Sequence, residues 1–129
     1  MMPDFSRYSL ALLKDGKIIF SSDKKGLRPL VECVDKYKLK GCILHDKVIG
    51  LAAARLIVYS GMIHSVLAGI VSKKARDLLE ENHIGVTADM VVEKILDQKR
   101  KDTCPMERKA EEMTDNQEFF LDLKKTLYL

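Results

Sequence analysis

Residues 41–72 read GCILHDKVIG LAAARLIVYS GMIHSVLAGI VS, and this stretch decides the fold. Gly41–Leu44 is a short apolar run after a glycine, which is typical of a strand buried on both faces. Asp46 is then a candidate N-cap for a helix over Val48–Tyr59, whose side chains are apolar almost all round, as in a buried helix. Ile63–Val71 has the composition of a second buried strand. The stretch therefore predicts a β-α-β unit with a right-handed crossover.

A β-hairpin and a helix are predicted before this unit. The β-prone runs Ser9–Leu13 and Lys17–Ser21 are separated by a turn with an Asp-Gly pair at 15–16, where Gly accepts the positive φ of a tight turn. Gly26–Tyr37 follows as a helix with Pro29 in its first turn, where a missing N–H does no harm.

Two further helices and a short strand are predicted directly after the unit. Ser72 is the candidate cap of a helix over Lys73–Asn82, and Ile84–Val86 is expected to form a short edge strand. Thr87 is then expected to cap a helix over Ala88–Leu96.

The last predicted element is an amphipathic helix that begins at a capping-box pattern made by Thr114 and Gln117. This order of elements predicts an α/β fold with three α/β/α layers, whose mixed sheet starts with an N-terminal antiparallel hairpin. We expect residues 1–113 to form the domain and residues 114–129 to form a C-terminal amphipathic helix.

Composition and charge exclude several classes of protein. With 129 residues, of which 47% are apolar and 32% charged, the chain has the profile of one globular domain. The net charge of +3 is interspersed, and the basic run 99–101 is flanked by Asp97 and Asp102, so a nucleic-acid partner is not expected. The longest apolar stretch, Val48–Ile63, is too short to span a membrane and contains Arg55. Three cysteines at unrelated spacings and an N-terminus without a signal-peptide pattern predict a cytoplasmic protein without disulfides.

Three motifs follow one another in an order and at spacings that are similar to a known family. They are Asp46-Lys47-Val48-Ile49-Gly50 before Ala52-Ala53-Ala54, Ile70-Val71-Ser72 before Ala75, and Cys104-Pro105-Met106-Glu107. Together with Gly26 and Pro29-Leu30, they resemble a prokaryotic family that is classed as a domain of unknown function and assigned the cytidine-deaminase-like fold. The resemblance covers about residues 8–108, and it implies that fold but no activity.

The metal ligands of a zinc deaminase are absent from the sequence. Such an enzyme needs a His or Cys two residues before a catalytic Glu, and a Pro-Cys-x-x-Cys motif at the next helix start. The chain has DKVIG (46–50) at the first place and SKKA (72–75) at the second, and it contains no His-x-Glu, Cys-x-Glu or Cys-x-x-Cys. We therefore expect no metal and no cofactor, and the standard deaminase reaction is argued against.

The starts of helices that follow parallel strands meet at one edge of the sheet, the usual ligand position in open α/β folds. The ligand-binding candidates at this edge are Asp46, Lys47, Gly50, Ser72 and Lys73. Free N–H groups and the helix dipole favour an anion there, although the Asp46 carboxylate opposes a phosphate at the first helix start. Ser72 with Lys73 and Lys74 is the better anion candidate, and the alternative is two ordinary N-caps with solvated lysines.

Cys104 and Glu107 are the remaining candidates. If Pro105 starts a helix, Cys104 occupies its N-cap, where the pKa of the thiol is lowered, and Glu107 reaches back toward the cap. A nucleophilic or redox cysteine is one interpretation. The other is a capped turn that packs Met106 against the domain.

We expect a zinc-free module that binds a nucleotide or a nucleoside-like small molecule. One alternative is a metal-free enzyme that uses Cys104, Asp46 or Lys47. Another is a structural or interaction protein, in which the last helix closes the core or forms the contact of a homo-oligomer. Neither a nucleic acid nor a membrane is expected as a partner, and whether the chain is an enzyme stays open.

Overall fold

A five-stranded mixed sheet forms the base of the fold in the computed structural model, which describes residues 2–95 and 105–128. Its strands are β1 (Leu10–Lys14), β2 (Lys17–Ser22), β3 (Cys42–Ile49), β4 (Ile63–Ser72) and β5 (Gly85–Val92). In space they follow the order β2-β1-β3-β4-β5. β1 is antiparallel to both of its neighbours, whereas β4 is parallel to both β3 and β5.

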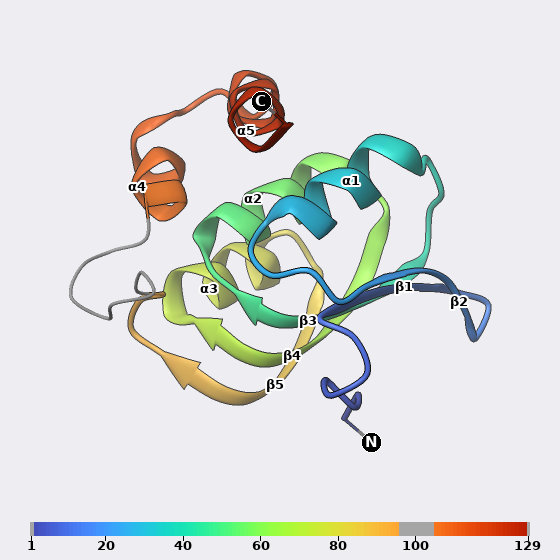
Figure 1. Cartoon of the computed structure of the whole chain (residues 1–129). Helices are drawn as coiled ribbons and strands as arrows, with labels where there is room; N and C mark the ends of the chain where they lie inside the picture. Colours follow the sequence, from blue (N-terminus) through green and yellow to red (C-terminus); the bar gives the residue numbers. More distant parts are fainter. Residues whose placement is uncertain (1, 96–104, 129) are drawn as a thin grey trace.

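The described helices are α1 (Arg28–Lys36), α2 (Leu51–Ser60), α3 (Lys73–Glu81), α4 (Pro105–Glu112) and α5 (Asn116–Tyr128). α1, α2 and α3 lie side by side on one face of the sheet, because three right-handed crossovers advance in the same direction across it. α4 and α5 pack on the outer side of α2, so the layers run from the sheet through α1–α3 to α4–α5 (Figure 1). The predicted α/β class, the mixed sheet, the antiparallel hairpin and an arrangement in three layers are confirmed, with both helix layers of the described residues on the same face of the sheet.

Several elements begin and end where local signals predict. Asp15 and Gly16 have φ values of 52° and 78°, the positive φ at both central positions that a type I′ turn requires. Pro29 lies in the first turn of α1, and Gly61 ends α2 with a φ of 66°. The backbone N–H of Ala75 donates to the Ser72 hydroxyl oxygen at 3.2 Å, so Ser72 caps α3 as expected.

β3 is longer than predicted, and α2 starts later. The predicted strand stops at Leu44, but β3 continues to Ile49 and α2 begins only at Leu51. The prediction that Asp46 is an N-cap is therefore wrong. The physical reason is that residues 46–49 pair in register with β4, and this backbone pairing carries the strand through polar residues.

β5 contradicts the predicted helix over Ala88–Leu96, whose last residue lies outside the described residues. Gly85–Val92 forms a parallel strand beside β4, and Thr87 lies inside this strand instead of capping a helix. The predicted short edge strand is thus confirmed in kind, but it runs further along the chain. Pairing with β4 decides the structure of this segment, because strand formation depends on neighbouring strands more than on local sequence.

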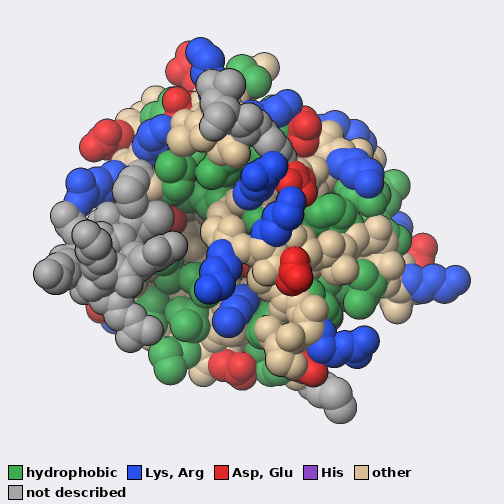
Figure 2. Space-filling model, in the orientation of Figure 1, with side chains coloured by type: hydrophobic (Ala, Val, Ile, Leu, Met, Phe, Trp, Pro, Cys, Tyr) green, Lys and Arg blue, Asp and Glu red, His purple; other side chains and the backbone are tan. Residues whose placement is uncertain are grey.

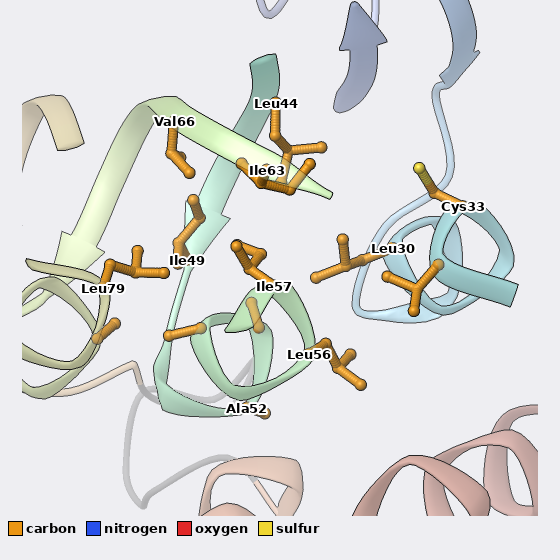
Figure 3. Packing of buried hydrophobic residues seen from close by; sticks show 14 of the residues in the cluster. Leu30, Cys33, Leu44, Ile49, Ala52, Leu56, Ile57, Ile63, Val66 and Leu79 are labelled. Carbon is orange, nitrogen blue, oxygen red and sulfur yellow. The ribbon is translucent and has the colours of Figure 1, made fainter. Parts of the chain in front are cut away.

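α2 lies at the centre of the hydrophobic core. Its buried apolar side chains are Ala52, Ala53, Ala54, Leu56 and Ile57. Figure 3 shows Ile57 between Ile49 of β3 and Leu30 of α1, so this helix joins the sheet to its neighbouring helix. The three consecutive alanines have small side chains, so the helix backbone can lie close to its neighbours.

α5 closes the core, which is one of the two roles expected for the last helix. Phe119, Phe120 and Leu123 are buried, and the ring centroids of Phe120 and Tyr59 of α2 are 5.2 Å apart. The apolar stripe of α5 is therefore used within the chain. Self-association through this helix stays a prediction.

The start of α5 differs from the predicted capping box. The helix begins at Asn116, and the backbone N–H of Glu118 donates to the Asp115 carboxylate at 2.8 Å. Asp115 therefore occupies the capping position that the sequence assigns to Thr114, and Gln117 is not its partner. An Asp caps a helix start at least as well as a Thr, which explains the shift by one residue.

The opposite face of the sheet is covered in part by the N-terminal segment (Figure 1). The Tyr8 hydroxyl lies 2.8 Å from His45 Nδ1, and the ring of Phe5 lies edge-on to Tyr8. Burial lowers the pKa of His45, which faces this segment from β3. Val48 of β3 and Met90 of β5 are 41% and 55% exposed, so the sheet also presents apolar side chains to solvent.

Two observations concern membranes and nucleic acids. Among residues 2–95 and 105–128, every helix is too short or too polar to cross a bilayer. On the face shown in Figure 2, Lys and Arg side chains are spread among Asp and Glu side chains. This face therefore resembles the interspersed charge pattern of the sequence more than a phosphate-binding stripe.

Candidate functional site

Glu107 of α4 binds the N-terminus of α2. Its side chain is 8% exposed. One carboxylate oxygen accepts the backbone N–H of Leu51 at 2.7 Å, and the other accepts that of Ala52 at 2.8 Å. A helix start has N–H groups without partners inside the helix and a positive dipole end, and a carboxylate satisfies both. Glu107 therefore acts as an N-cap that comes from a distant part of the sequence.

Gly50 makes this contact possible. A Cβ atom at this position would lie 2.4 Å from Oε1 of Glu107, closer than any real contact allows. The geometry thus accounts for Gly50 and Glu107 together, two residues from separate sequence motifs. The expectation that Glu107 reaches back toward residue 104 is corrected here, because both of its oxygens bind the backbone of α2. Cys104 itself lies outside the described residues.

Burial raises the pKa of Glu107, and the two hydrogen bonds from Ala52 and Leu51 lower it less than burial raises it. Glu111 raises this pKa further and Lys74 lowers it, so both charges lie within electrostatic reach of the carboxylate. The start of α2 therefore has an internal anion, which takes the position that a bound phosphate would need.

Asp46 faces the helix layer from the middle of β3. It lies in register with Leu10 and Ala68, which are both buried. Burial raises the pKa of Asp46 well above its ordinary value, and the nearby backbone N–H groups of Val48 and Lys47 lower it less. An acid with a pKa raised in this way costs stability at neutral pH, and such groups are concentrated at functional sites.

Asp46→Asn is expected to stabilise the fold progressively as the pH rises. The folded-state pKa of Asp46 lies above the ordinary value of 3.8, so the parent loses stability as the pH rises from there through the folded-state pKa. Asn has nearly the same shape and cannot ionise, so it avoids the cost of a charge at this position. Urea titrations at pH 4 and pH 7 measure the difference, with the exposed β5 variant Asp89→Asn as control. A variant that gains nothing between the two pH values contradicts this assignment.

Cys33 and Cys42 are buried, and Asp46 lies within electrostatic reach of Cys33. Burial raises the pKa of Cys33 to about 12, with smaller contributions from Cys42 and Asp46, and burial also raises the pKa of Cys42. Thiols with a raised pKa are poor nucleophiles at neutral pH. These two cysteines are therefore structural members of the core.

The other predicted site residues do not meet in one cavity. Lys47 is exposed on β3, and Ser72 uses its hydroxyl oxygen to cap α3. The Lys73 ammonium lies 2.5 Å from a carboxylate oxygen of Glu93 at the exposed surface. The structure brings Gly50 and Glu107 together, whereas Asp46, Lys47 and Lys73 are each placed separately.

Arg55 is a buried cation on the outer side of α2, with 8% of its surface exposed. Its guanidinium donates to the backbone carbonyls of Ala110 and Met113, and two of its nitrogens donate to the Asn116 side-chain oxygen at 3.1 and 2.8 Å. It also lies 4.5 Å from the ring centroid of Phe119. Arg55 therefore holds the end of α4 and the start of α5 against α2.

A cleft opens beside Arg55, between α2, α3 and the α4–α5 pair. Its volume is about 330 Å³. The apolar part of its lining consists of Leu51, Val58, Leu78 and Ala110, and the polar part consists of Arg55, Lys74, Glu111 and Asn116. At the rim, the Lys74 ammonium lies 3.1 Å from a Glu111 carboxylate oxygen. An apolar wall with a few polar groups is the usual composition of a small-molecule site.

The sequence interpretation missed most of this lining. The signal for Arg55 was present, because it is the one charged residue within the apolar stretch Val48–Ile63. Glu111 and Asn116 gave no such signal, since they belong to a charged segment that resembles any solvated surface. Among the described residues, no group of three His, Cys, Asp or Glu side chains is arranged to hold a metal ion.

Comparison with known proteins identifies a family for this chain and a similar solved structure. A family model described as "Domain of unknown function (DUF1893)" matches residues 5–127. The crystal structure of a DUF1893 family protein (TM1506) from Thermotoga maritima is similar, with a TM-score of 0.83 at 29% sequence identity. The match covers 95% of this chain and 84% of that chain. No curated protein matches the sequence.

Proposed function

Since the chain belongs to the DUF1893 family of unknown function, we propose that it binds a nucleotide or nucleoside-like small molecule in the cleft between α2, α3 and α4–α5. The observation that carries this proposal is the cleft itself. Small-molecule sites typically have volumes of about 300–1,000 Å³, so a volume of about 330 Å³ fits a molecule the size of one nucleoside. Leu51, Val58 and Leu78 provide an apolar wall for a flat ring.

The polar groups of the cleft support a ligand of this kind. Lys74 offers N–H donors at the rim, and Glu111 offers acceptor oxygens. The Asn116 oxygen is used by Arg55, which leaves its amide NH₂ group as a donor for a ligand. A base or sugar with mixed donors and acceptors matches this set.

The likeness to the cytidine-deaminase fold stays a prediction, and it supports the proposal by analogy alone. The sequence lacks the His-x-Glu, Cys-x-Glu and Cys-x-x-Cys motifs of zinc deaminases, so the proposal includes no deamination. Whether the bound molecule is also transformed is left to experiment.

A thermal-shift screen with nucleosides and nucleotides tests the proposal. A ligand at about 100 times its dissociation constant should add about 2.7 kcal/mol of stability. Val58→Phe, which fills the cleft, should abolish the shift, whereas the exposed β2 variant Ile18→Phe should keep it. The proposal is wrong if no compound stabilises the protein, or if Val58→Phe leaves the shift unchanged.

A further inference from the structure

We infer that the cleft accepts an unphosphorylated molecule of nucleoside size and rejects its phosphorylated form. This inference rests on the proposed function and narrows the class of ligand. It follows from the way in which Lys74 and Arg55, the cations of the described lining, are already engaged by groups of this chain.

Lys74 is the first of these cations. Its ammonium lies 3.1 Å from Glu111, and the buried carboxylate of Glu107 lies within electrostatic reach of both side chains. One carboxylate thus pairs with this ammonium, and a second lies within electrostatic reach of it. A phosphate that approached Lys74 would meet the repulsion of both, because like charges at short range oppose each other.

Arg55 is the second cation, and its donors are used. Four hydrogen bonds to Ala110, Met113 and Asn116 occupy four of the five N–H groups of a guanidinium. A phosphate would have to break the contacts that hold α4 and α5 in place. Asp115 also lies within electrostatic reach of Arg55 and adds another negative charge on that side.

At the starts of α2 and α3, groups of this chain already accept backbone N–H groups. Glu107 accepts the N–H groups of Leu51 and Ala52 at the start of α2. Ser72 accepts the N–H of Ala75 at the start of α3. Internal acceptors therefore occupy N–H groups that bind phosphate at other helix starts.

A neutral ligand avoids these costs and still finds partners. Its ring can lie against Leu51, Val58 and Leu78, and a ligand N–H or O–H can donate to Glu111. A phosphate group brings a charge of about −1.5 to −2 at neutral pH, whereas both cations of the described lining, Arg55 and Lys74, are already paired. We expect each nucleoside to bind about tenfold or more tightly than its monophosphate, because the added charge is repelled by the carboxylates of Glu111 and Glu107.

Calorimetric titration of the full chain with four nucleosides and their monophosphates tests the inference. Glu111→Gln removes one carboxylate from the rim and should shift the preference toward the monophosphate by about tenfold. Glu112→Gln, an exposed neighbour on α4 outside the cleft lining, should leave the preference unchanged.

The possible results separate the inference from the proposed function. If neither form of any compound binds, the proposed function is wrong and the inference falls with it. If monophosphates bind as tightly as nucleosides or more tightly, the inference is overturned while the proposed function stands. A preference for nucleosides that Glu111→Gln does not reduce also overturns the electrostatic explanation.

Discussion

Gly50→Ala is expected to destabilise the protein by about 2–4 kcal/mol, because it forces Glu107 away from two buried N–H groups that each cost about 1–3 kcal/mol when left without a partner. The new Cβ would meet Oε1 of Glu107 at 2.4 Å. The backbone of Gly50, with φ −98°, is open to alanine, so the cost comes from the lost contact and not from strain. Denaturant unfolding in urea measures the loss.

A double-mutant cycle with Glu107→Ala makes this prediction specific. Glu107→Ala alone should cost a similar amount, and adding Gly50→Ala to it should cost little more, because the atoms that clash are gone. Gly85→Ala is the matched control, since its Cβ would meet Ser65 at an ordinary 3.5 Å. Additive losses from Gly50→Ala and Glu107→Ala would show that the two residues do not act as one unit.

Arg55→Ala is expected to cost about 3–5 kcal/mol, the loss typical of removing one partner from a buried charged network. The carbonyls of Ala110 and Met113 lose their donor, and the Phe119 ring loses the guanidinium beside it. Arg55→Lys should recover only part of the loss, because one ammonium cannot reach both carbonyls and the Asn116 oxygen together. Urea unfolding again gives the stability.

Loss of this role should loosen α4 and α5 before the rest of the protein, and a local measurement can detect this. We expect limited proteolysis to cut Arg55→Ala within α4 and α5 before it cuts the sheet, since these helices lose their tie to α2. Arg76→Ala is the control, because Arg76 makes only exposed ion pairs with Asp77 and Glu80, and such pairs contribute up to about 1 kcal/mol. Uniform cleavage across the chain in Arg55→Ala would contradict the assignment.

The parts of the fold that could be predicted are those with local signals. The Asp-Gly pair at 15–16 predicts the hairpin, and both residues have the positive φ that the turn needs. Ser72 predicts the start of α3, which it caps. The length of β5 could not be predicted, because residues 87–92 become a strand through pairing with β4 and not through their own pattern. Asp46 was misplaced for the same reason, since pairing with two strands extends β3 past it.

The candidate site shows a similar division. Gly50 and Glu107 both stood out in the sequence, but the hydrogen bond from Leu51 to Glu107 spans 56 residues, so only the fold reveals this contact. Arg55 stood out as a charge in an apolar helix, yet two of its partners are backbone carbonyls. Backbone carbonyls are common to every residue, so no sequence pattern can mark Ala110 and Met113 as acceptors.

The positions of the Arg55 partners in the sequence also determine the order in which parts of the domain can assemble during synthesis. They lie 55 to 61 residues further along the chain, so they leave the ribosome after the whole sheet has been synthesised. The sheet and α1–α3 can assemble from residues 10–92, but the outer side of α2 must stay hydrated until Asn116 has emerged. A nascent chain halted between β5 and α5 is therefore expected to expose this side of α2 to chaperones. The domain is completed when α5 has emerged and packs against α2.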